Sequence, residues 1–550
     1  MSRSGSASFS LVASGVTVAR GAQVVLDAVE VAVAPRSRLG VVGPNGVGKS
    51  TLLHILAGIE TPDSGTVQRT PPDLHVAYLA QEQHEDTETV GVMLARRSGT
   101  AEIAAALDAA SAALAIGGAG ADEAYAQALD AYLAAGCADL DARVAVAVGE
   151  VGLAPDLVGA PLGRLSGGQR ARAALAAVLL LRADVVLLDE PTNDLDFEGL
   201  EILERFLVRR PGGMVVVSHD RAFLERTVTS VLELDEHTHQ GTRYDGGWGA
   251  YLEARDVSRR HAQENYATYQ VERTRLRQRS QRQREWATQG TTSAKRDGDE
   301  RDKYIRQFKV ASSERLAAKA RATDRALERL PEVTKPWEGW DLHFEIAPAP
   351  RSGAIAMRLT DAVVERGKFR MGPTTLEVAW ADRVALVGRN GSGKTTLLET
   401  LLGRVPLTAG TRWVGPSVVI GELEQDRRQL TGSATLLDLV RTPAGITVAE
   451  VRGQLAKFGL GAEHLDRPAA SLSPGERTRA VLAEFALCGV NCLILDEPSN
   501  HLDLPAIEEL EAALQRYSGT LLLVTHDRAL LEHVSTTRTF HLRDGTLDEA

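Results

Sequence analysis

The sequence predicts an α/β protein in which two copies of one domain are joined by a long helical hairpin. Two glycine-rich loops of one pattern, each after an apolar run, lie 345 residues apart, and in each copy a second apolar run ends in two carboxylates. Between the copies, residues 251–330 hold 20 Lys+Arg, 12 Asp+Glu and no proline. At about 100–200 residues per domain, we expect domains at 8–248 and 353–550 and a linker at 249–345.

The composition excludes several classes of protein. A net charge of −11 argues against a uniformly basic nucleic-acid coat protein, and no apolar run reaches the roughly 18 residues of a membrane span. The first residues lack the basic-then-apolar pattern of a secretion signal. Cys137, Cys488 and Cys492 cannot build a disulfide framework, so we expect buried thiols in a cytoplasmic protein.

The glycine-rich loops have the pattern of phosphate-binding P-loops. Residues 43–50 read GPNGVGKS and residues 388–395 read GRNGSGKT, each after a strand-like run and before a helical pattern. Glycines let backbone N–H groups surround nucleotide phosphates, and the helix dipole adds to the attraction. A glycine-rich turn that binds nothing is the alternative, and the repetition argues against it. The expected nucleotide contacts are Gly43, Pro44, Asn45, Gly46, Val47, Gly48, Lys49 and Ser50, and Gly388, Arg389, Asn390, Gly391, Ser392, Gly393, Lys394 and Thr395.

The two acidic runs add groups that nucleotide hydrolysis needs. Each is a continuous apolar run ending in Asp-Glu-Pro, which is typical of a strand buried on both faces of a parallel sheet. We expect the aspartates and the P-loop hydroxyls to hold Mg²⁺, and the glutamates to polarise the attacking water. The magnesium ligands are then Ser50, Asp189, Thr395 and Asp496, and the catalytic glutamates are Glu190 and Glu497.

With these motifs the chain resembles the ATP-binding-cassette family. Residues 165–169 read LSGGQ, like the signature loop of that family, and residues 472–476 read the variant LSPGE. The signature serine stands 23 residues before the acidic aspartate in both copies, and a histidine follows that aspartate by 30 residues. The resemblance implies further site residues: Ser166, Gly168, Ser473 and Gly475 from the signatures, His219 and His526 as switch histidines, and Gln81 and Gln425 as magnesium ligands.

The resemblance also implies that the two cassettes of one monomer pair head to tail around two molecules of ATP. ATP would hold the halves together and hydrolysis would release them, with Mg²⁺ as the second cofactor. Site one would combine Lys49, Ser50, Gln81, Asp189, Glu190 and His219 with Ser473 and Gly475; site two would combine Lys394, Thr395, Gln425, Asp496, Glu497 and His526 with Ser166 and Gly168. We expect both sites to hydrolyse ATP.

Three features depart from the family pattern. No aromatic residue for adenine stands at 19–21 or 365–367, so either an arginine stacks on the base or the base is loosely held. Asp194 stands where the second copy has His501, which puts the equivalence of the two sites in doubt. The first copy has 37 extra residues between glutamine and signature. They fall in the alanine-rich stretch 95–147, which predicts an enlarged helical subdomain that either docks on a partner or pads the domain.

The linker has its own charge and pattern. Residues 251–330 have a net charge of +8, whereas the rest of the chain has −19. We expect helices over roughly 250–286 and 300–330, with a tip near 288–298, and a long helix that is polar nearly all round is not a core element. Interleaved arginines and aromatic residues suit contacts with RNA phosphates and bases. An inert charged linker is the alternative.

Tandem cassettes with a long basic linker resemble the ABC-F proteins, and in particular their antibiotic-resistance branch in actinomycete antibiotic producers. The resemblance implies an ATPase that binds the ribosome through rRNA contacts of residues 251–330, works without a membrane subunit, and protects the ribosome from an antibiotic, with the macrolide type as first choice. Two alternatives are a housekeeping translation factor of the same family and the ATPase subunit of a drug exporter. An exporter ATPase does not need a basic hairpin between its cassettes.

Overall fold

In the computed structural model the chain divides into two compact units, Met1–Tyr251 with Leu342–Ala550, and Leu252–Asp341. The first unit contains both cassettes, and the second contains the linker helices. The structure describes residues 8–21, 23–80, 86–117, 120–296, 303–331, 353–367, 369–423, 434–444, 446–500 and 502–550.

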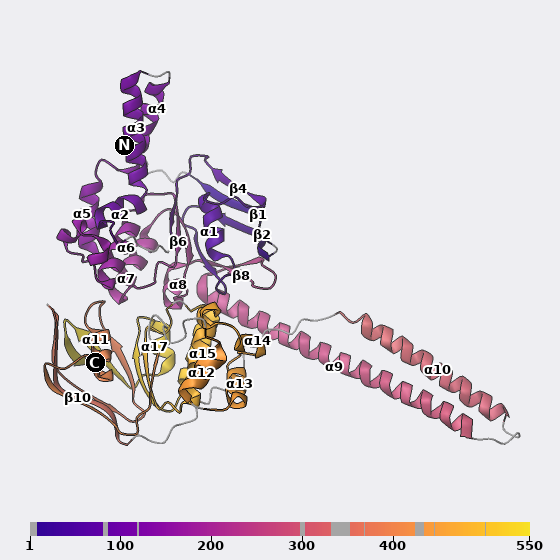
Figure 1. Cartoon of the computed structure of the whole chain (residues 1–550). Helices are drawn as coiled ribbons and strands as arrows, with labels where there is room; N and C mark the ends of the chain where they lie inside the picture. Colours follow the sequence, from indigo (N-terminus) through magenta and orange to yellow (C-terminus); the bar gives the residue numbers. More distant parts are fainter. Residues whose placement is uncertain are drawn as a thin grey trace. The chain divides into compact units, whose positions relative to one another are not determined.

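Two sheets and the helix after the glycine-rich loop form one part of the first cassette (Figure 1). The antiparallel sheet has the order β2 (Gln23–Val33), β1 (Ser10–Arg20), β4 (Ser64–Thr70). The second sheet has the order β5 (Val76–Leu79), β6 (Val185–Asp189), β7 (Gly213–Val217), β3 (Arg38–Val42), β8 (Ser230–Leu234), β9 (Gly241–Asp245), and only its last pairing is antiparallel. Helix α1 (Lys49–Ala57) shares an apolar cluster with strands of both sheets.

The opposite face of the parallel sheet is covered by helices. A second apolar cluster joins the sheet to α2 (Val90–Arg97), α5 (Leu140–Glu150), α6 (Gly167–Leu180), α7 (Phe197–Arg209) and α8 (Arg221–Thr227). The strands β6 and β7 are buried along their whole length because both faces are covered. The alanine-rich stretch forms α3 (Thr100–Ile116) and α4 (Ala121–Ala135), which lie side by side (Figure 1).

The second cassette repeats this architecture, which confirms the predicted fold class. Its antiparallel sheet has the order β11 (Phe369–Ala379), β10 (Ile355–Arg366), β13 (Ala409–Val414). Its other sheet has the order β14 (Ile420–Leu423), β15 (Cys492–Asp496), β16 (Thr520–Val524), β12 (Arg383–Val387), β17 (Arg538–Arg543), β18 (Thr546–Glu549). Its helices are α11 (Lys394–Leu402), α12 (Leu436–Ala444), α13 (Val448–Lys457), α14 (Ala462–Leu465), α15 (Pro474–Leu487), α16 (Leu504–Arg516) and α17 (Arg528–Val534).

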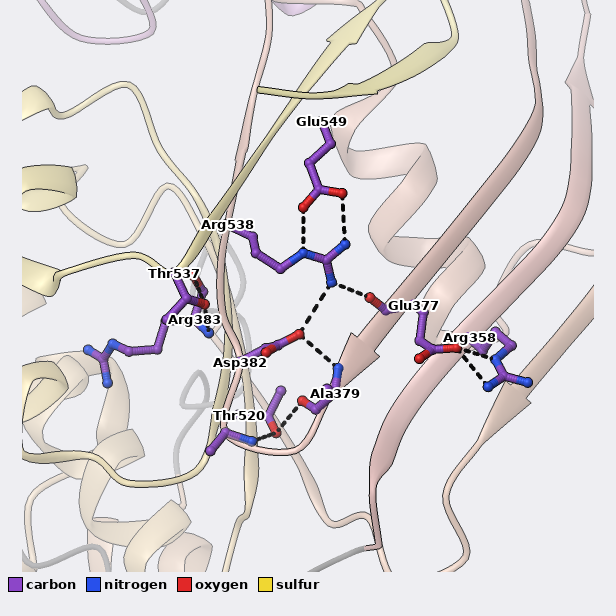
Figure 2. Close-up of polar contacts among 10 residues, drawn as sticks. Arg358, Glu377, Ala379, Asp382, Arg383, Thr520, Thr537, Arg538 and Glu549 are labelled. Atoms are coloured by element: carbon purple, nitrogen blue, oxygen red, sulfur yellow. Dashed lines mark hydrogen bonds and ion pairs between the residues drawn. The ribbon is translucent and has the colours of Figure 1, made fainter.

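A polar network ties the two sheets of the second cassette together (Figure 2). Arg538 in β17 forms a two-fold ion pair with Glu549 in β18, at 2.6 and 3.0 Å, and donates to the Glu377 carbonyl of β11 at 2.7 Å. Asp382, just before β12, accepts from Arg538 at 3.3 Å and from the Ala379 backbone N–H at 2.9 Å. The edge strand β18 is therefore held to both sheets by charge-assisted bonds.

The linker helices are α9 (Gly247–Arg296), whose first residues belong to the first unit, and α10 (Lys303–Glu328). Figure 1 shows them as an elongated hairpin. Helix α9 continues past the predicted end near 286 because a single glycine, Gly290, costs a helix only about 1 kcal/mol. The two helices meet through polar side chains, with Thr323 donating to Gln283 at 3.0 Å and Arg284 pairing with Asp324 at 2.6 Å. Residues 288–296 of the expected tip near 288–298 belong to α9, and its last two residues, 297 and 298, lie outside the described residues.

In the described part of the chain no single helix is long and apolar enough to cross a membrane. Helices α2 and α3, which are bent by 82° relative to each other, reach the length and apolar composition of a span only when they are taken together. The three cysteines are free thiols. Only Cys492 is buried, so the expectation of three buried thiols was wrong. Cys137 and Cys488 follow the ends of α4 and α15, where they are half-buried.

Candidate ATP-hydrolysis sites

Each P-loop follows a strand of the parallel sheet and ends at the first turn of a helix. Gly48 and Gly393 precede α1 and α11 with φ of 106° and 107°, a conformation that other residues rarely adopt. Both positions are also crowded, since a Cβ on Gly393 would lie 2.5 Å from Cζ of Phe369. Glycine is therefore required here by conformation and by space.

Each P-loop lysine folds back over its own loop. Lys49 Nζ donates to the carbonyl oxygens of Gly43 and Pro44, at 2.7 and 3.0 Å, and Lys394 Nζ makes the matching bonds to Gly388 and Arg389, at 2.7 and 3.2 Å. These carbonyls hold the ammonium at the centre of the loop, where a nucleotide phosphate would replace them as its partner.

Carboxylates of both cassettes influence the pKa of these lysines. Burial lowers the pKa of Lys49, while Glu190 of its own cassette and Asp503 of the other raise it. Burial likewise lowers the pKa of Lys394, which Glu497 and Asp196 raise. Each lysine therefore lies in the electrostatic field of both halves of the chain.

The catalytic-glutamate candidates occupy a strained turn directly after β6 and β15. Glu190 and Glu497 have φ of 48° and 46°, and their backbone N–H groups donate to Val217 and Val524 of the neighbouring strands at 3.0 and 2.8 Å. This left-handed turn aims both carboxylates into the site instead of along the strand. Burial, opposed by the P-loop lysine, raises the pKa of Glu190 to about 7 and that of Glu497 to about 8. A carboxylate with a pKa near neutrality is suited to accept a proton from water.

The switch histidines lie against these glutamates. His219 Nε2 is 3.2 Å from Glu190 Oε1, and His526 Nε2 is 3.5 Å from Glu497 Oε1. Burial, and then the nearby lysine, lowers the pKa of each histidine to about 3, so both rings are neutral at physiological pH. The two sites differ here, because Lys394 Nζ also reaches His526 Nε2 at 3.0 Å.

The groups around Asp496 fit a magnesium ion. Thr395 Oγ1 donates to Asp496 Oδ2 at 3.4 Å, so the P-loop hydroxyl and the strand carboxylate already meet. One hydroxyl and one carboxylate, completed by phosphates and water, suit Mg²⁺. The histidine contacts at Glu190 Oε1 and Glu497 Oε1 are not hydrogen bonds, so these two oxygens and Ser392 Oγ are buried without a hydrogen-bond partner among the described residues. They are therefore available to a nucleotide and its waters. Gln81 and Gln425 lie outside the described residues.

The signature serines cap the helices that follow them. Ser166 Oγ accepts from the Gln169 N–H at 3.3 Å at the start of α6, and Ser473 Oγ accepts from the Glu476 N–H at 3.2 Å at the start of α15. The variant loop keeps this geometry because Pro474 occupies the first helical position, where proline needs no hydrogen bond. Both signatures therefore present a hydroxyl and a helix N-terminus, a combination that attracts anions.

Contacts between the cassettes bring most of site two together. Asn390 in the second P-loop donates from its backbone N–H to Asp196 Oδ2 at 3.0 Å, and from its side chain to the Asp194 carbonyl at 2.7 Å. Gly168 of the first signature packs against Asn390 so closely that a Cβ would lie 2.5 Å from Cβ of Asn390. A cavity of about 1010 Å³ reaches from Ser166 and Gly168 to Lys394, Thr395, Asp496, Glu497 and His526.

Site one is less fully assembled. The Asn45 N–H of the first P-loop donates to Asp503 Oδ2 at 3.1 Å, and Asn45, Asp189, Glu190 and His219 line the same cavity. Neither Ser473 nor Gly475 is among the described residues that line it. Both P-loops thus contact the other cassette, and among the described residues a signature lines the cavity only beside the second P-loop.

Two kinds of functional residue were missed in the sequence. Asp196 and Asp503 cap the helices α7 and α16 and also bind the P-loop of the other cassette, and their pairing across the chain becomes visible only in three dimensions. Phe369 begins β11 and lines the cavity beside Lys394. It stands 25 residues before Lys394, and this aromatic residue just beyond 365–367 was the available signal. The matching hairpin position in the first cassette is Gln23.

Comparisons with known proteins agree with this geometry. A family model described as "ABC transporter" matches residues 26–193 and 372–500. The chain is 33% identical over 569 residues to the tylosin resistance ATP-binding protein TlrC of Streptomyces fradiae, a match that covers 98% of each chain. It is 31% identical over 525 residues to the energy-dependent translational throttle protein EttA of Escherichia coli, covering 91% of this chain and 86% of that one.

Among solved structures, the complex of an archaeal ribosome recycling factor, aABCE1, with the stalk protein aP1 contains a chain with a similar fold. The TM-score is 0.58 at 18% identity, over 97% of this chain and 89% of that chain. The two P-loops, the acidic turns, the capped signatures and these relatives give one answer. The chain belongs to the ABC-F proteins of the ABC transporter family, and it is an ATP-binding protein and an ATPase.

Proposed function

We propose that this protein binds the ribosome through its basic hairpin and uses ATP-driven pairing of its two cassettes to protect the ribosome from an antibiotic of the macrolide type. The cassettes are residues 8–248 and 353–550, and the linker is 249–345. The single observation that supports this most is the relationship to the tylosin resistance protein, which extends over 98% of both chains. Tylosin is a macrolide.

In this proposal each ATP lies between the P-loop of one cassette and the signature of the other. Lys49 and Lys394 neutralise the phosphates, and Mg²⁺, held by Asp189 and Asp496 with the P-loop hydroxyls, polarises the bond that breaks. Glu190 and Glu497 accept the proton of the attacking water, and the switch histidines orient it. The bonds from Asn390 to Asp196 and Asp194 support this pairing.

The ribosome is proposed as partner on two grounds. Residues 251–330 have a net charge of +8 in a chain of −11, and Arg277, Arg279 and Arg282 are exposed on α9. Such a surface suits the phosphates of rRNA. Two similar proteins carry names that refer to translation or the ribosome, the translational throttle protein and the archaeal recycling factor. A protein with this task would work in the cytoplasm.

A second candidate function is that of a housekeeping translation factor. The translational throttle protein is 31% identical to this chain, close to the 33% of the tylosin resistance protein. The two functions share the ATP sites and the ribosome. They differ in whether an antibiotic must be present for the protein to increase protein synthesis.

Cell-free translation in a membrane-free extract separates these functions. Purified protein added to an extract inhibited by tylosin should restore synthesis, and the double variant Glu190→Gln/Glu497→Gln should not. Restoration without membranes would exclude export. If neither tylosin nor a ribosomal drug of another class is counteracted, while the protein changes synthesis in drug-free extract, the housekeeping function replaces the first. The double variant should also lose ATPase activity. If it hydrolyses ATP at the parental rate, the assignment of both glutamates is refuted.

A further inference from the structure

Each switch histidine is followed two residues later by an arginine that pairs with a glutamate of the other cassette. Arg221 begins α8 and makes a two-fold ion pair with Glu511 in α16, with Nη1 3.1 Å from Oε2 and a shorter contact from Nη2 to Oε1. Arg528 begins α17, and its Nη1 is 3.0 Å from Glu204 Oε1 in α7. The two pairs are related by the 307-residue offset of the repeat.

All four side chains are largely shielded from water. The exposed fractions are 14% for Arg221 and 7% for Glu511, and 18% for Arg528 and 11% for Glu204. Removing one partner of a buried ion pair is strongly destabilising, because it leaves an uncompensated charge in a poorly solvated place. Removing one partner of an ion pair on an open surface would change the stability little. The burial therefore makes each arginine sensitive to whether the other cassette is in place.

The glutamates lie on helices that contact the opposite ATP site twice. Helix α16 is capped by Asp503, which accepts from Asn45 of the first P-loop, and Glu511 follows eight residues later, about 12 Å along the helix. Helix α7 repeats this with Asp196 on Asn390 of the second P-loop and Glu204 on Arg528. One rigid helix thus contacts the other cassette at two places, the P-loop and the arginine that follows the switch histidine.

The same helices begin close to the glutamate of their own site. Asp196 lies six positions after Glu190, and Asp503 lies six positions after Glu497. A movement of one catalytic turn would therefore reach the start of α7 or α16, and from there the start of the opposite α17 or α8. His219 stands two residues before Arg221 and 3.2 Å from Glu190, so a displaced Arg221 would displace the histidine.

We propose that Arg221–Glu511 and Arg528–Glu204 are positioning pairs of the ATPase reaction, which set the geometry of each switch histidine only when the opposite cassette is docked. They act through the histidines and do not touch ATP. This inference rests on the proposed roles of His219, His526 and the two glutamates, and it is independent of the ribosome as partner.

The second pair has additional support that the first lacks. The Arg528 guanidinium lies 5.5 Å from the ring centroid of Phe197, and that ring meets His526 edge to face at 5.2 Å. Phe197 belongs to the first cassette, and the residue at its repeat position in the second is Leu504. Loss of Arg528 should therefore be tolerated better than loss of Arg221, because Phe197 still orients His526.

The test is the steady-state ATPase of the full chain without ribosomes. Arg221→Gln and Glu511→Gln should each lower kcat by about 10-fold or more, with the KM for ATP within about 2-fold of the parent. The charge swap Arg221→Glu/Glu511→Arg should recover at least a third of the parental kcat. Arg221→Lys should recover less than the swap, because an ammonium cannot make the two-fold pair.

Arg96→Gln is the matched control, since Arg96 makes a two-fold pair with Glu88 of its own cassette, at 2.9 and 3.0 Å, and is half-exposed. It should leave kcat near the parental value. Unchanged kcat in Arg221→Gln and Glu511→Gln would overturn the inference, and so would an equal loss in the swap with a lowered Tm, which indicates packing alone. If Glu190→Gln/Glu497→Gln keeps parental turnover, the proposed catalytic roles fail first, and that result is distinguishable from a failure of the pairs.

Discussion

At the residue scale, the environment of a side chain decides its chemistry at these sites. Glu190 and Asp220 are both acids on loops after parallel strands, and burial raises the pKa of the first to about 7 and of the second to about 6. Burial also acts to raise the pKa of Asp235, but bonds from the Thr238 and His237 N–H groups outweigh it and lower that pKa. Within one cassette the environment thus raises the pKa of some acidic side chains and lowers that of others.

Asp220 makes the stability of the protein depend on pH. Burial, together with Asp527 and Glu204 and against Arg528, raises the pKa of Asp220 to about 6, so the stabilisation it contributes is full below about pH 4 and is lost as the pH rises through about 6. Asp220→Asn keeps the cap on Phe223, for which asparagine is as good, and should be more stable than the parent at pH 8, by up to about 3 kcal/mol. Tm measured at pH 5 and pH 8 checks this.

Asp235→Asn is the control of opposite sign. The pKa of Asp235 is lowered, so its ionised form stabilises the fold above the usual pKa, and the variant should have a lower Tm at pH 8. A rise of Tm at pH 8 in both variants would point to a general charge effect and against the specific role of Asp220.

Phe369 should make one ATP site bind adenine more tightly than the other. The ring lies in the cavity of the second P-loop, whereas the matching residue of the first cassette is Gln23. Phe369→Ala should weaken one of two binding events for a fluorescent ATP analogue by roughly 1–3 kcal/mol, the contribution of one stacked base. Phe369→Trp should restore it, and Gln23→Ala should change neither event. An equal loss at both sites would contradict the asymmetry.

At the element scale, the linker hairpin is held by polar contacts where most helix pairs use apolar ones. Ser280, Gln283 and Thr323 are 5 to 8% exposed, and Ala320 at 2% lies among them. Polar groups that meet at one place in a pair of helices define the register of the pair better than a uniform apolar seam does. The rest of the hairpin is then left free to carry arginines outward.

Replacing one partner of a buried polar pair should loosen this hairpin. Thr323→Val removes the donor to Gln283 and should destabilise the hairpin by about 1–3 kcal/mol, because Gln283 keeps a buried, unpaired oxygen. The double variant Gln283→Leu/Thr323→Val should be nearer to the parent. Hydrogen exchange of α9 and α10 amides measures both, with the exposed Arg325→Ala as control. If the single and the double variant exchange alike, the pair does not define the register.

At the scale of the whole molecule, the chain is divided into parts of opposite net charge. The net charge of −11 is the sum of +8 in residues 251–330 and −19 elsewhere. In the proposed sites ATP is bound through the backbone of a P-loop and one lysine, so a cassette needs no basic surface. In the proposed function the acidic remainder also restricts the attraction for RNA to the hairpin.

Ribosome binding should therefore depend on salt through the hairpin alone. Changing Arg277, Arg279 and Arg282 to Gln should weaken binding at each salt concentration and reduce the slope of log K against log salt by about 1 for each phosphate that is no longer neutralised. Co-sedimentation of the Glu190→Gln/Glu497→Gln background with ribosomes in ATP gives this slope. The same changes at Arg205 and Arg209 on α7 serve as the control, and a similar weakening there would place the RNA-binding surface elsewhere.

The sequence alone was sufficient for the repeat and the fold class. It also supplied the glycine, lysine and acidic motifs of the proposed ATP sites, because such motifs carry their chemistry at short range. It also predicted two linker helices, although α9 runs ten residues further than expected, to Arg296. Only the tertiary structure joined Asp196 to Asn390, Arg221 to Glu511 and Phe369 to the second P-loop. These partners lie far apart in the chain, and no local pattern records which strand edge or helix face will meet another once both cassettes have folded.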